Sequence, residues 1–549
     1  MLAFICPDSD KPEKHSREDS FSGMIDKGTK FVEKHKKHIE AGIFVFIAVS
    51  FGITRLWQLN ILPFGMHMDE AGMAYDAWCL SAYGVDRWLK SWPVYMTNFY
   101  SGQSSMYAFL CAWLFRIFGY SIWLVRLPAV LFSLLTLIFG MKLARNIYPD
   151  DTFPSWILGL LVTFCPYFVM SGRLALDCNL MLGMSTVFLY MLATAIDTEK
   201  YWRYVVCGLA GGLLLYTYVL TYLILPFFLL LVLIYVIAVR KFSFSKWLLM
   251  AIPMGLLATP LIMVQIVNYF DLPEMKLGIF TITKLPGYRV SEVGSFRLAN
   301  LVVALRSIFV GDTYAFDSIP GIWNLYAITV VLFIIGFVST LIQVIRMLSK
   351  RKLTFYALPL FWFLVMLMIE SHISANSYRI NGIFLVVALM AVEGVHAVKR
   401  FLSLKEIKWF SVVLIGLCGI YAVCFLRFGV FYYSGRYTEA TYPITYFGCP
   451  FPEGAEYIEN HQFLKDRVTY VSEQGIFYAI SALVPPWEFD ITGDASGPWK
   501  NYWFASLPEI SGEFNYLVRD GFGEYCDQLL QEGFTEIRFE NYSLFYMEP

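Results

Sequence analysis

Long apolar segments separated by short polar ones run along the chain from residue 41 to residue 427. A helix that crosses a membrane needs about 20 consecutive, mainly apolar residues. The segments of this kind are 41–59, 123–142, 153–171, 178–196, 204–220, 221–239, 247–268, 322–345, 353–370, 380–398 and 409–427. The pattern therefore predicts a polytopic α-helical membrane protein with about eleven transmembrane helices.

One further apolar segment, residues 104–118, is short and is interrupted by Arg116. If it crossed the membrane, the Lys and Arg clusters of all later loops would lie outside. If it lies on the outer surface instead, these clusters face the cytoplasm, as the positive-inside rule requires. The clusters are Lys142 with Arg145, Lys200 with Arg203, Arg240 with Lys241 and Lys246, Arg346 with Lys350, Arg351 and Lys352, and Lys399 with Arg400, Lys405 and Lys408. We therefore predict an interfacial helix at 104–118 and a cytoplasmic N-terminus.

This topology divides the chain into three regions. Residues 1–40 are polar and Lys-rich, without the apolar core and cleavage site of a signal peptide, and are predicted to form a cytoplasmic tail. Residues 41–429 form the transmembrane domain, with outer loops at 60–122 and 269–321. Residues 430–549 form a small extracytoplasmic α/β domain, because strand-like and helix-like segments alternate there. Its expected strands are 468–472, 516–518, 536–539 and 543–546, and its expected helices are 452–461 and 524–532.

Composition narrows the class of function. The chain is 58% hydrophobic and only 15% charged, with a formal net charge of -1, so no basic field points to a nucleic-acid partner. The predicted spans carry almost no charge near their centres, whereas ion-coupled transporters use ionisable groups there. The ten cysteines lack metal-site spacing, and Cys449 with Cys526 is a candidate disulfide of the outer domain. These features favour chemistry at the outer membrane surface in a multi-pass plasma-membrane protein.

An acidic pair, Asp69 and Glu70, follows the first predicted span on its outer side. Two adjacent carboxylates just outside the hydrocarbon layer are costly to keep there without a role. They suit general-base chemistry or cation binding at the membrane face. The bland alternative for Asp69 is a helix cap, since Asp often caps helices.

Several motifs resemble the GT-C superfamily of glycosyltransferases. They are the Asp69-Glu70 pair with Tyr75, the run Gly102-Gln103-Ser104-Ser105-Met106-Tyr107, the sequence Arg126-Leu127-Pro128, and an Arg-x-x-x-Asp motif formed by Arg173 and Asp177. The chain is most similar to the protein O-mannosyltransferases of glycosyltransferase family 39 and to the aminoarabinose transferases of lipid A. It departs from the latter where Ser-Gly-Gln replaces their Lys-Pro-Pro run. Its 269–321 loop is also too short for the β-trefoil insertion of the mannosyltransferases, so neither acceptor is carried over.

The resemblance implies an enzyme that takes a sugar from a polyprenyl-phosphate carrier and attaches it to an acceptor hydroxyl with inversion. Asp69 then corresponds to the general base, and Asp177 is a second catalytic candidate. Glu70 is grouped with these catalytic candidates, and for it acceptor binding and a share in holding a divalent cation stay open, with a solvated neighbour of Asp69 as the structural alternative. Arg173 is a substrate-binding candidate beside the structural alternative of an Arg173–Asp177 ion pair.

Three further side chains are substrate-binding candidates at the outer surface. Arg379 opens the tenth span from outside, where its charge would meet a lipid phosphate, with interfacial anchoring as the alternative. Tyr75 and Gln103 would orient sugar or phosphate. The expected partners are the lipid-linked donor, a glycan, lipid or protein acceptor, and membrane lipids. A flippase, exporter or polymerase of lipid-linked glycans is the alternative function.

Overall fold

The computed structural model describes residues 35, 37–99, 101–287, 294–312, 317–373, 376–405, 410–436, 447–448, 451–489 and 496–549. The predicted cytoplasmic tail falls mostly outside these residues, and Cys449 of the candidate disulfide does too, so both stay predictions. By its internal contacts the chain divides into residues 1–53 and 54–549. The arrangement described below is that of the second unit.

Each of the eleven predicted spans overlaps a helix, and within the described residues eight helices are long and apolar enough to cross a membrane. The eight are Lys37–Leu56, α4 (Ile122–Ile147), α7 (Cys178–Thr198), α9 (Thr221–Ala238), α10 (Phe244–Tyr269), α12 (Ala327–Ser349), Asn381–Leu404, which contains α14 (Phe384–Leu404), and Val412–Tyr433 within α15 (Phe410–Tyr433). Shorter apolar helices are α3 (Ser105–Phe118), α5 (Phe153–Phe164), α8 (Tyr201–Leu215), α11 (Leu298–Phe309) and α13 (Ala357–Glu370). The expected class, a polytopic helical membrane protein, is confirmed.

A proline divides one predicted span, and the segment 104–118 has the length of an interfacial helix. The predicted span 153–171 is two helices, α5 and α6 (Pro166–Ser171), because Cys165 precedes a proline and adopts an extended conformation. The segment 104–118 is the helix α3 of 14 residues. Such a helix is about 21 Å long, well short of a hydrocarbon layer of about 30 Å. This length agrees with the predicted interfacial helix.

The predicted outer loop 60–122 is itself a folded layer. It contains β1 (Met66–His67), α2 (Met68–Tyr83), the hairpin of β2 (Tyr95–Asn98) and β3 (Ser101–Ser104), and α3. Helices α2 and α3 pack against each other, and α3 packs against the start of α4. The later loop 269–321 adds a small hairpin of β4 (Met275–Leu277) and β5 (Phe280–Ile282) beside α10, followed by α11.

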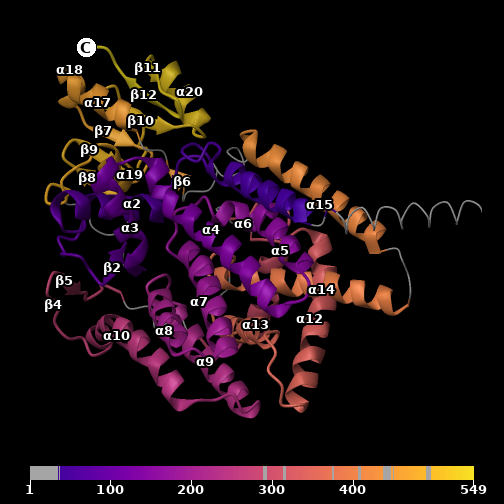
Figure 1. Ribbon diagram of the computed structural model, residues 1–549. Coiled ribbons are helices and arrows are strands. Elements are labelled where there is room, and N and C mark those ends of the chain that lie inside the picture. The colour runs from indigo at the N-terminus through magenta and orange to yellow at the C-terminus, as the bar shows by residue number, and fades with distance from the viewer. Residues whose placement is uncertain are drawn as a thin grey trace, which may run out of the picture. The chain divides into compact units, whose positions relative to one another are not determined.

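The C-terminal region is a six-stranded sheet in the order β11-β12-β10-β7-β9-β8. The strands are β7 (Thr469–Val471), β8 (Gly497–Trp499), β9 (Tyr502–Phe504), β10 (Asn515–Arg519), β11 (Thr535–Arg538) and β12 (Tyr542–Tyr546). All four predicted strands and both predicted helices, α17 (Pro452–Asn460) and α20 (Gly523–Gln531), are present. The pattern missed β8, β9 and α19 (Gly475–Ser481), which packs against α2 (Figure 1).

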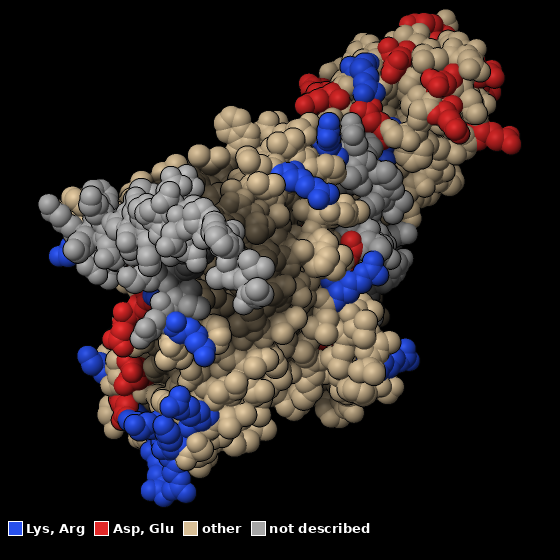
Figure 2. Space-filling view, turned by 90° about the vertical axis from the view of Figure 1, so that its right-hand side faces the viewer, with Lys and Arg blue, Asp and Glu red and all other residues tan. Residues whose placement is uncertain are grey.

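Charge separates towards two ends of the unit. The C-terminal sheet region carries exposed acidic side chains, which Figure 2 shows at the upper end of the molecule. They include Glu453, Glu456, Glu459, Glu513, Glu524, Asp527, Glu532 and Glu540. Exposed basic residues such as Lys350, Arg351 and Lys352 follow the lower end of α12. The surface between the two ends is mostly uncharged in this view, as expected for a surface that faces lipid.

A buried carboxylate ties three long helices together at one end of the bundle. Glu393 of α14 accepts hydrogen bonds from the Tyr148 hydroxyl after α4 at 2.6 Å and from Ser339 of α12 at 2.6 Å. The Arg400 guanidinium donates to the same carboxylate at 2.5 Å. Because the Glu393 side chain is only 1% exposed, each of these donors offsets the cost of burying its charge.

We expect Glu393→Gln to lower thermal stability in detergent by several degrees. The amide replaces one carboxylate oxygen with an N–H₂ group, which meets a donor where the oxygen had accepted from it, and an unsatisfied buried polar group costs about 1–3 kcal/mol. The matched control is Glu199→Gln, which removes an acid that is 43% exposed and pairs with Lys241 and Lys246. An exposed pair contributes about 0–1 kcal/mol. Equal unfolding temperatures for the two variants would therefore contradict a stabilising role of the Glu393 contacts.

Candidate functional site

A polar cavity of about 350 Å³ opens between the first outer layer and the segment before α14. Its walls combine two carboxylates, one guanidinium, three side-chain amides and three tyrosines. The lining residues are His67, Met68, Asp69, Tyr95, Asn98, Gly102, Gln103, Leu176, Asp177, Cys178, Tyr218, Val219, Asn376, Tyr378 and Arg379. Four predicted site residues, Asp69, Gln103, Asp177 and Arg379, thus line one cavity although they come from four separate segments.

The start of α2 fixes the direction of the two adjacent carboxylates. Glu70 is fully buried, and its oxygens accept from the Arg126 side chain at 2.9 and 3.2 Å and from the His67 backbone N–H at 3.2 Å. The backbone N–H of Ala175 adds a fourth donor at 3.3 Å. Glu70 therefore caps α2 and pairs with Arg126, outside the cavity lining, and these contacts favour a structural role for it.

Asp69, one residue earlier, lies at the cavity with its side chain 39% exposed. Its backbone N–H donates to Nδ1 of His67 at 3.1 Å, which requires that nitrogen to be unprotonated. Burial lowers the pKa of His67, against the opposing effect of Asp69 and Glu70, and so favours the same neutral state. Asp69 is accordingly not the helix cap, because His67 and Glu70 together cap α2.

Asp177 stands on the neighbouring wall, at the N-cap of α7. One oxygen accepts from the Cys178 backbone N–H at 2.8 Å, and the other accepts from the N–H of Ser104, at the end of β3, at 3.1 Å. Helix N-termini favour negative charge, so this position stabilises an ionised carboxylate. Gly102 lies on the adjoining strand, where a Cβ would approach the Tyr95 ring to 2.1 Å. Glycine there lets Tyr95 reach the cavity.

Arg379 lines the same cavity from the segment that precedes α14. Its backbone N–H donates to Oδ1 of Asn376 at 3.1 Å. Ser377 anchors the same segment, because its hydroxyl is within hydrogen-bond distance of two carboxylates, 2.7 Å from Asp312 and 2.6 Å from Asp317. The cavity lining thus combines two acidic side chains, those of Asp69 and Asp177, with the basic side chain of Arg379.

Two other predicted site residues lie elsewhere in the fold. Arg173 is fully buried and donates to backbone carbonyls of residues 54–62 and to the Tyr432 hydroxyl, and it pairs with neither cavity carboxylate in any described contact. Tyr75 is buried in α2 and donates to the Val484 carbonyl of the C-terminal region at 2.7 Å. The side chains of Arg173 and Tyr75 hold chain segments together and are not part of the cavity lining.

The residues at Glu70 do not fit a metal ion. Both of its oxygens already accept from N–H donors, and the Arg126 guanidinium occupies the place a cation would take. Across the described part of the chain, no group of three or more His, Cys, Asp or Glu side chains could hold a metal ion.

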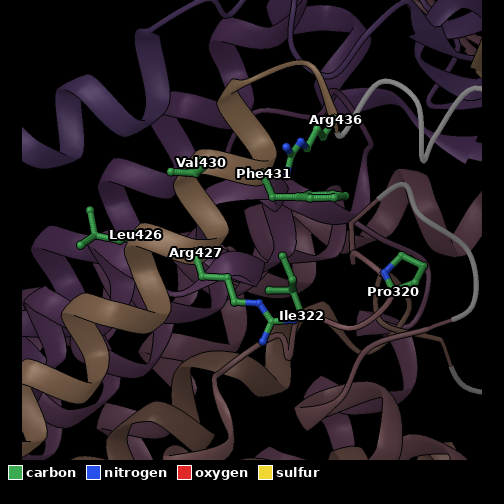
Figure 3. Close-up of a pocket in the computed structure, with 7 residues that line it drawn as sticks. All are labelled: Pro320, Ile322, Leu426, Arg427, Val430, Phe431 and Arg436. Carbon is green, nitrogen blue, oxygen red and sulfur yellow. The ribbon is translucent and has the colours of Figure 1, made fainter.

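Two other hollows differ in chemistry from the polar cavity. One, of about 440 Å³, lies beside α15 and is lined by apolar side chains together with Arg427 and Arg436 (Figure 3). The other, of about 360 Å³, is an apolar groove between α3, α8, α10 and the β4–β5 hairpin. Neither has a carboxylate in its described lining, so neither supplies a general base.

Sequence reasoning missed several cavity residues. Asn98, Tyr95 and Tyr218 are single polar residues in otherwise apolar or mixed surroundings, a pattern common at any membrane interface. Asn376 lay beside Arg379 in the segment already singled out, and proximity to that arginine is the one signal that could have found it. Strand pairing, which brings Asn98 to the cavity, is not legible in such a short hairpin.

A family model matches part of the chain, and solved structures have a similar fold. Residues 103–265 match the family model of dolichyl-phosphate-mannose-protein mannosyltransferases. No curated protein sequence matches the chain. The structure of ArnT from Cupriavidus metallidurans bound to undecaprenyl phosphate is similar, with a TM-score of 0.54 at 11% identity, covering 92% of this chain and 98% of that chain. Its apo structure gives a TM-score of 0.51 at 11% identity, covering 93% and 98%.

The archaeal oligosaccharyltransferase AglB from Archaeoglobus fulgidus is more distant, with a TM-score of 0.45 at 13% identity over 82% of this chain and 64% of that chain. That score is too low to support an argument about shared structure. The ArnT comparison, in contrast, extends over nearly the whole of both chains and includes the C-terminal region. Together, the matched mannosyltransferase segment and the ArnT fold confirm the predicted resemblance of this chain to the GT-C superfamily of glycosyltransferases.

Proposed function

We propose that this protein is an inverting glycosyltransferase that moves a monosaccharide from a polyprenyl-phosphate carrier to an acceptor hydroxyl at the outer face of the membrane. The observation that carries the proposal is a polar cavity whose lining includes Asp69, Asp177 and Arg379. Transfer from a phosphate leaving group needs a base for the acceptor and a cation for the phosphate. ArnT, whose fold the chain shares, has been solved with undecaprenyl phosphate bound.

The proposed step forms one bond and breaks another at the anomeric carbon. The acceptor oxygen attacks that carbon while Asp69 takes the hydroxyl proton. The bond from the anomeric carbon to the phosphate oxygen breaks, and the departing polyprenyl phosphate keeps the electron pair. Arg379 stabilises the added negative charge on that phosphate, as a guanidinium does with its fixed fork of donors.

The apolar groove offers a place for the carrier's isoprenoid chain. Val94 and Ser105 line this groove, and they directly flank the β2–β3 hairpin whose Tyr95, Asn98, Gly102 and Gln103 line the polar cavity. One hairpin therefore forms a wall of both spaces. A lipid phosphate at Arg379 with its chain along α3 and α10 would bury apolar surface at about 25 cal/mol per Å².

Asp177 and Gln103 are proposed to bind the sugar. Both lie on the same wall, since the Ser104 backbone N–H donates to Asp177. A carboxylate and an amide next to each other offer acceptors and donors for sugar hydroxyls. The shape of the cavity determines which sugar it accepts, and a panel of polyprenyl-phosphate monosaccharides identifies that sugar.

The first prediction concerns the two adjacent acids. We expect Asp69→Asn to lower transfer about a hundredfold to ten-thousandfold, the usual contribution of general-base catalysis, with unchanged thermal stability because the side chain is partly exposed. We expect Glu70→Gln to lower thermal stability, because it leaves Arg126 buried without its ion pair. Release or transfer of sugar from a panel of polyprenyl-phosphate monosaccharides, followed by mass spectrometry, together with thermal unfolding, measures both.

Turnover by Asp69→Asn would remove the assigned base. If wild type also fails on every monosaccharide donor while both proteins retain an intact lipid-linked oligosaccharide, the flippase or polymerase function replaces the transferase.

The second prediction concerns the leaving phosphate. We expect Arg379→Ala to weaken binding of polyprenyl phosphate about tenfold or more, since a charge-assisted hydrogen bond is worth about 1.5–3 kcal/mol, while Arg379→Lys recovers only part of the loss. Binding is measured by isothermal titration in detergent micelles. The control is Arg427→Ala, which changes a guanidinium in the hollow beside α15. Equal affinities for Arg379→Ala and wild type would return Arg379 to membrane anchoring.

A further inference from the structure

We propose that Asn98 is a positioning residue that holds the catalytic carboxylate of Asp69, and that Arg87 fixes Asn98 in turn. The inference rests on the proposed function, because it assigns a role around the proposed base. It adds two residues that neither the motifs nor the cavity's charges single out.

Asn98 stands between Asp69 and Arg87 in a continuous chain of hydrogen bonds. Its Nδ2 donates to Oδ1 of Asp69 at 2.8 Å. Its Oδ1 accepts from Nη2 of Arg87 at 2.6 Å. Asn98 is 7% exposed, so neither end of the amide is well placed to exchange its partner for water.

The charges at the two ends allow only one orientation of the amide. A guanidinium offers donors and no acceptor, whereas an ionised carboxylate offers acceptors and no donor. If the amide turned over, its oxygen would face Asp69 and its N–H₂ group would face Arg87, and both contacts would be repulsive. Arg87 thus makes Asn98 a fixed donor toward Asp69.

Arg87 is itself held from several sides. Its backbone N–H donates to Asp76 of α2 at 3.1 Å, and its Nε lies 3.6 Å from the same carboxylate oxygen. The guanidinium lies over the Phe99 ring, 5.0 Å from the centroid. A Cβ at Gly72 would come within 2.7 Å of Arg87 and 3.0 Å of Asn98, so glycine at that helix position leaves the space they occupy.

Two buried acids stand at the far end of this chain of contacts. Asp76 and Asp86 are both fully buried, and burial raises the pKa of each, while Arg87 lowers the pKa of Asp76. The charge of Arg87 is therefore needed where it is, beside Asp76, and turning the side chain into the cavity would leave Asp76 without it. Arg87 is accordingly placed to act on Asp69 only through Asn98.

The arrangement distinguishes the two oxygens of Asp69. Oδ1 is engaged by the Asn98 amide, so Oδ2 is the oxygen that takes the acceptor's proton. A hydrogen bond to a carboxylate favours its ionised form, which is the form that acts as a base. Loss of the amide therefore both frees the side chain to rotate and makes its protonation easier.

Other ionisable groups also face Asp69 and would act on the same proton. They are His67 from β1, Asp177 and Cys178 from the start of α7, Tyr95 from β2, Tyr218 from the α8–α9 connection, Tyr378 and Arg379 from the segment before α14, and the buried Glu70 next in the chain. All of them stay in place when only Asn98 is changed. A change in the pH dependence of that variant therefore reports the amide.

The test compares Asn98→Ala and Asn98→Asp with Thr97→Val. Thr97 is the neighbouring residue of β2, and its buried hydroxyl has no hydrogen-bond partner among the residues that the structure describes, so valine keeps the strand while changing nothing at Asp69. Asn98→Asp keeps the side-chain shape and can pair with Arg87, but it turns a carboxylate oxygen toward Asp69. This variant separates loss of the donor from failure to fold.

We expect kcat for Asn98→Ala to fall about tenfold to a hundredfold, the range for a hydrogen bond to a charged group, with KM for the lipid-linked donor within about twofold of wild type. The acid limb of its pH–rate profile should move upward by about one pH unit. Asn98→Asp should lose more activity than Asn98→Ala although it folds, and Thr97→Val should match wild type. An Asn98→Ala enzyme with an unchanged acid limb, or with kcat intact, would overturn the proposal.

A readout without turnover keeps this inference separate from the proposed function. Carbodiimides modify protonated carboxyl groups, so the pH at which half of Asp69 is labelled can be followed by peptide mass spectrometry. We expect this pH to be higher in Asn98→Ala than in wild type and in Thr97→Val. If wild type transfers no sugar but the labelling shift appears, the proposed function fails and the positioning of Asp69 stands. If wild type transfers sugar but the labelling does not shift, the positioning role fails alone.

Discussion

The buried ion pair between Glu70 and Arg126 is the interaction on which the rest of the site depends. Arg126 also donates to the carbonyls of Leu59 and Gly65, so one guanidinium joins the end of the first membrane helix, the entry to α2 and the start of α4. Glu70 adds the segment before α7 through Ala175. An uncompensated buried charge is strongly destabilising, and the two residues therefore hold these four segments in one arrangement.

Helical geometry explains how one acid of the pair serves structure and the other serves the cavity. Successive side chains on a helix point about 100° apart, so burying Glu70 against Arg126 directs Asp69 to a different side of α2. The capping contacts of His67 remove the remaining freedom at this helix end. The two adjacent acids therefore have different roles. Glu70 holds the helix end in place, and Asn98 then fixes Asp69 at the cavity.

The sequence predicts the transmembrane helices and most of the C-terminal sheet, because apolar length and strand alternation are local signals. It also singles out Asp69, Asp177, Gln103 and Arg379, which line one cavity. Motifs that resemble the GT-C superfamily point to the first three, and its position at the start of a predicted span points to Arg379; their individual roles stay predictions. It cannot separate these from Glu70, Tyr75 and Arg173, since burial depends on tertiary packing. Arg173 is an example. Its guanidinium donates hydrogen bonds to backbone carbonyls in a bend at residues 54–62, and no sequence motif reveals that bend.

The contact between Tyr75 and Val484 joins residues 409 positions apart in the chain. The short pairing of β1 with β6 (Phe447–Gly448), in which Met66 lies opposite Gly448, also brings the entry to α2 against a late segment. During synthesis, therefore, the helix that carries Asp69 is made early but lacks part of its packing until the last hundred or so residues have emerged. A chain that stopped before residue 448 would carry both carboxylates but would lack these contacts of α2 and its entry. The packing around the helix that carries Asp69 is therefore completed only when these late residues have been made.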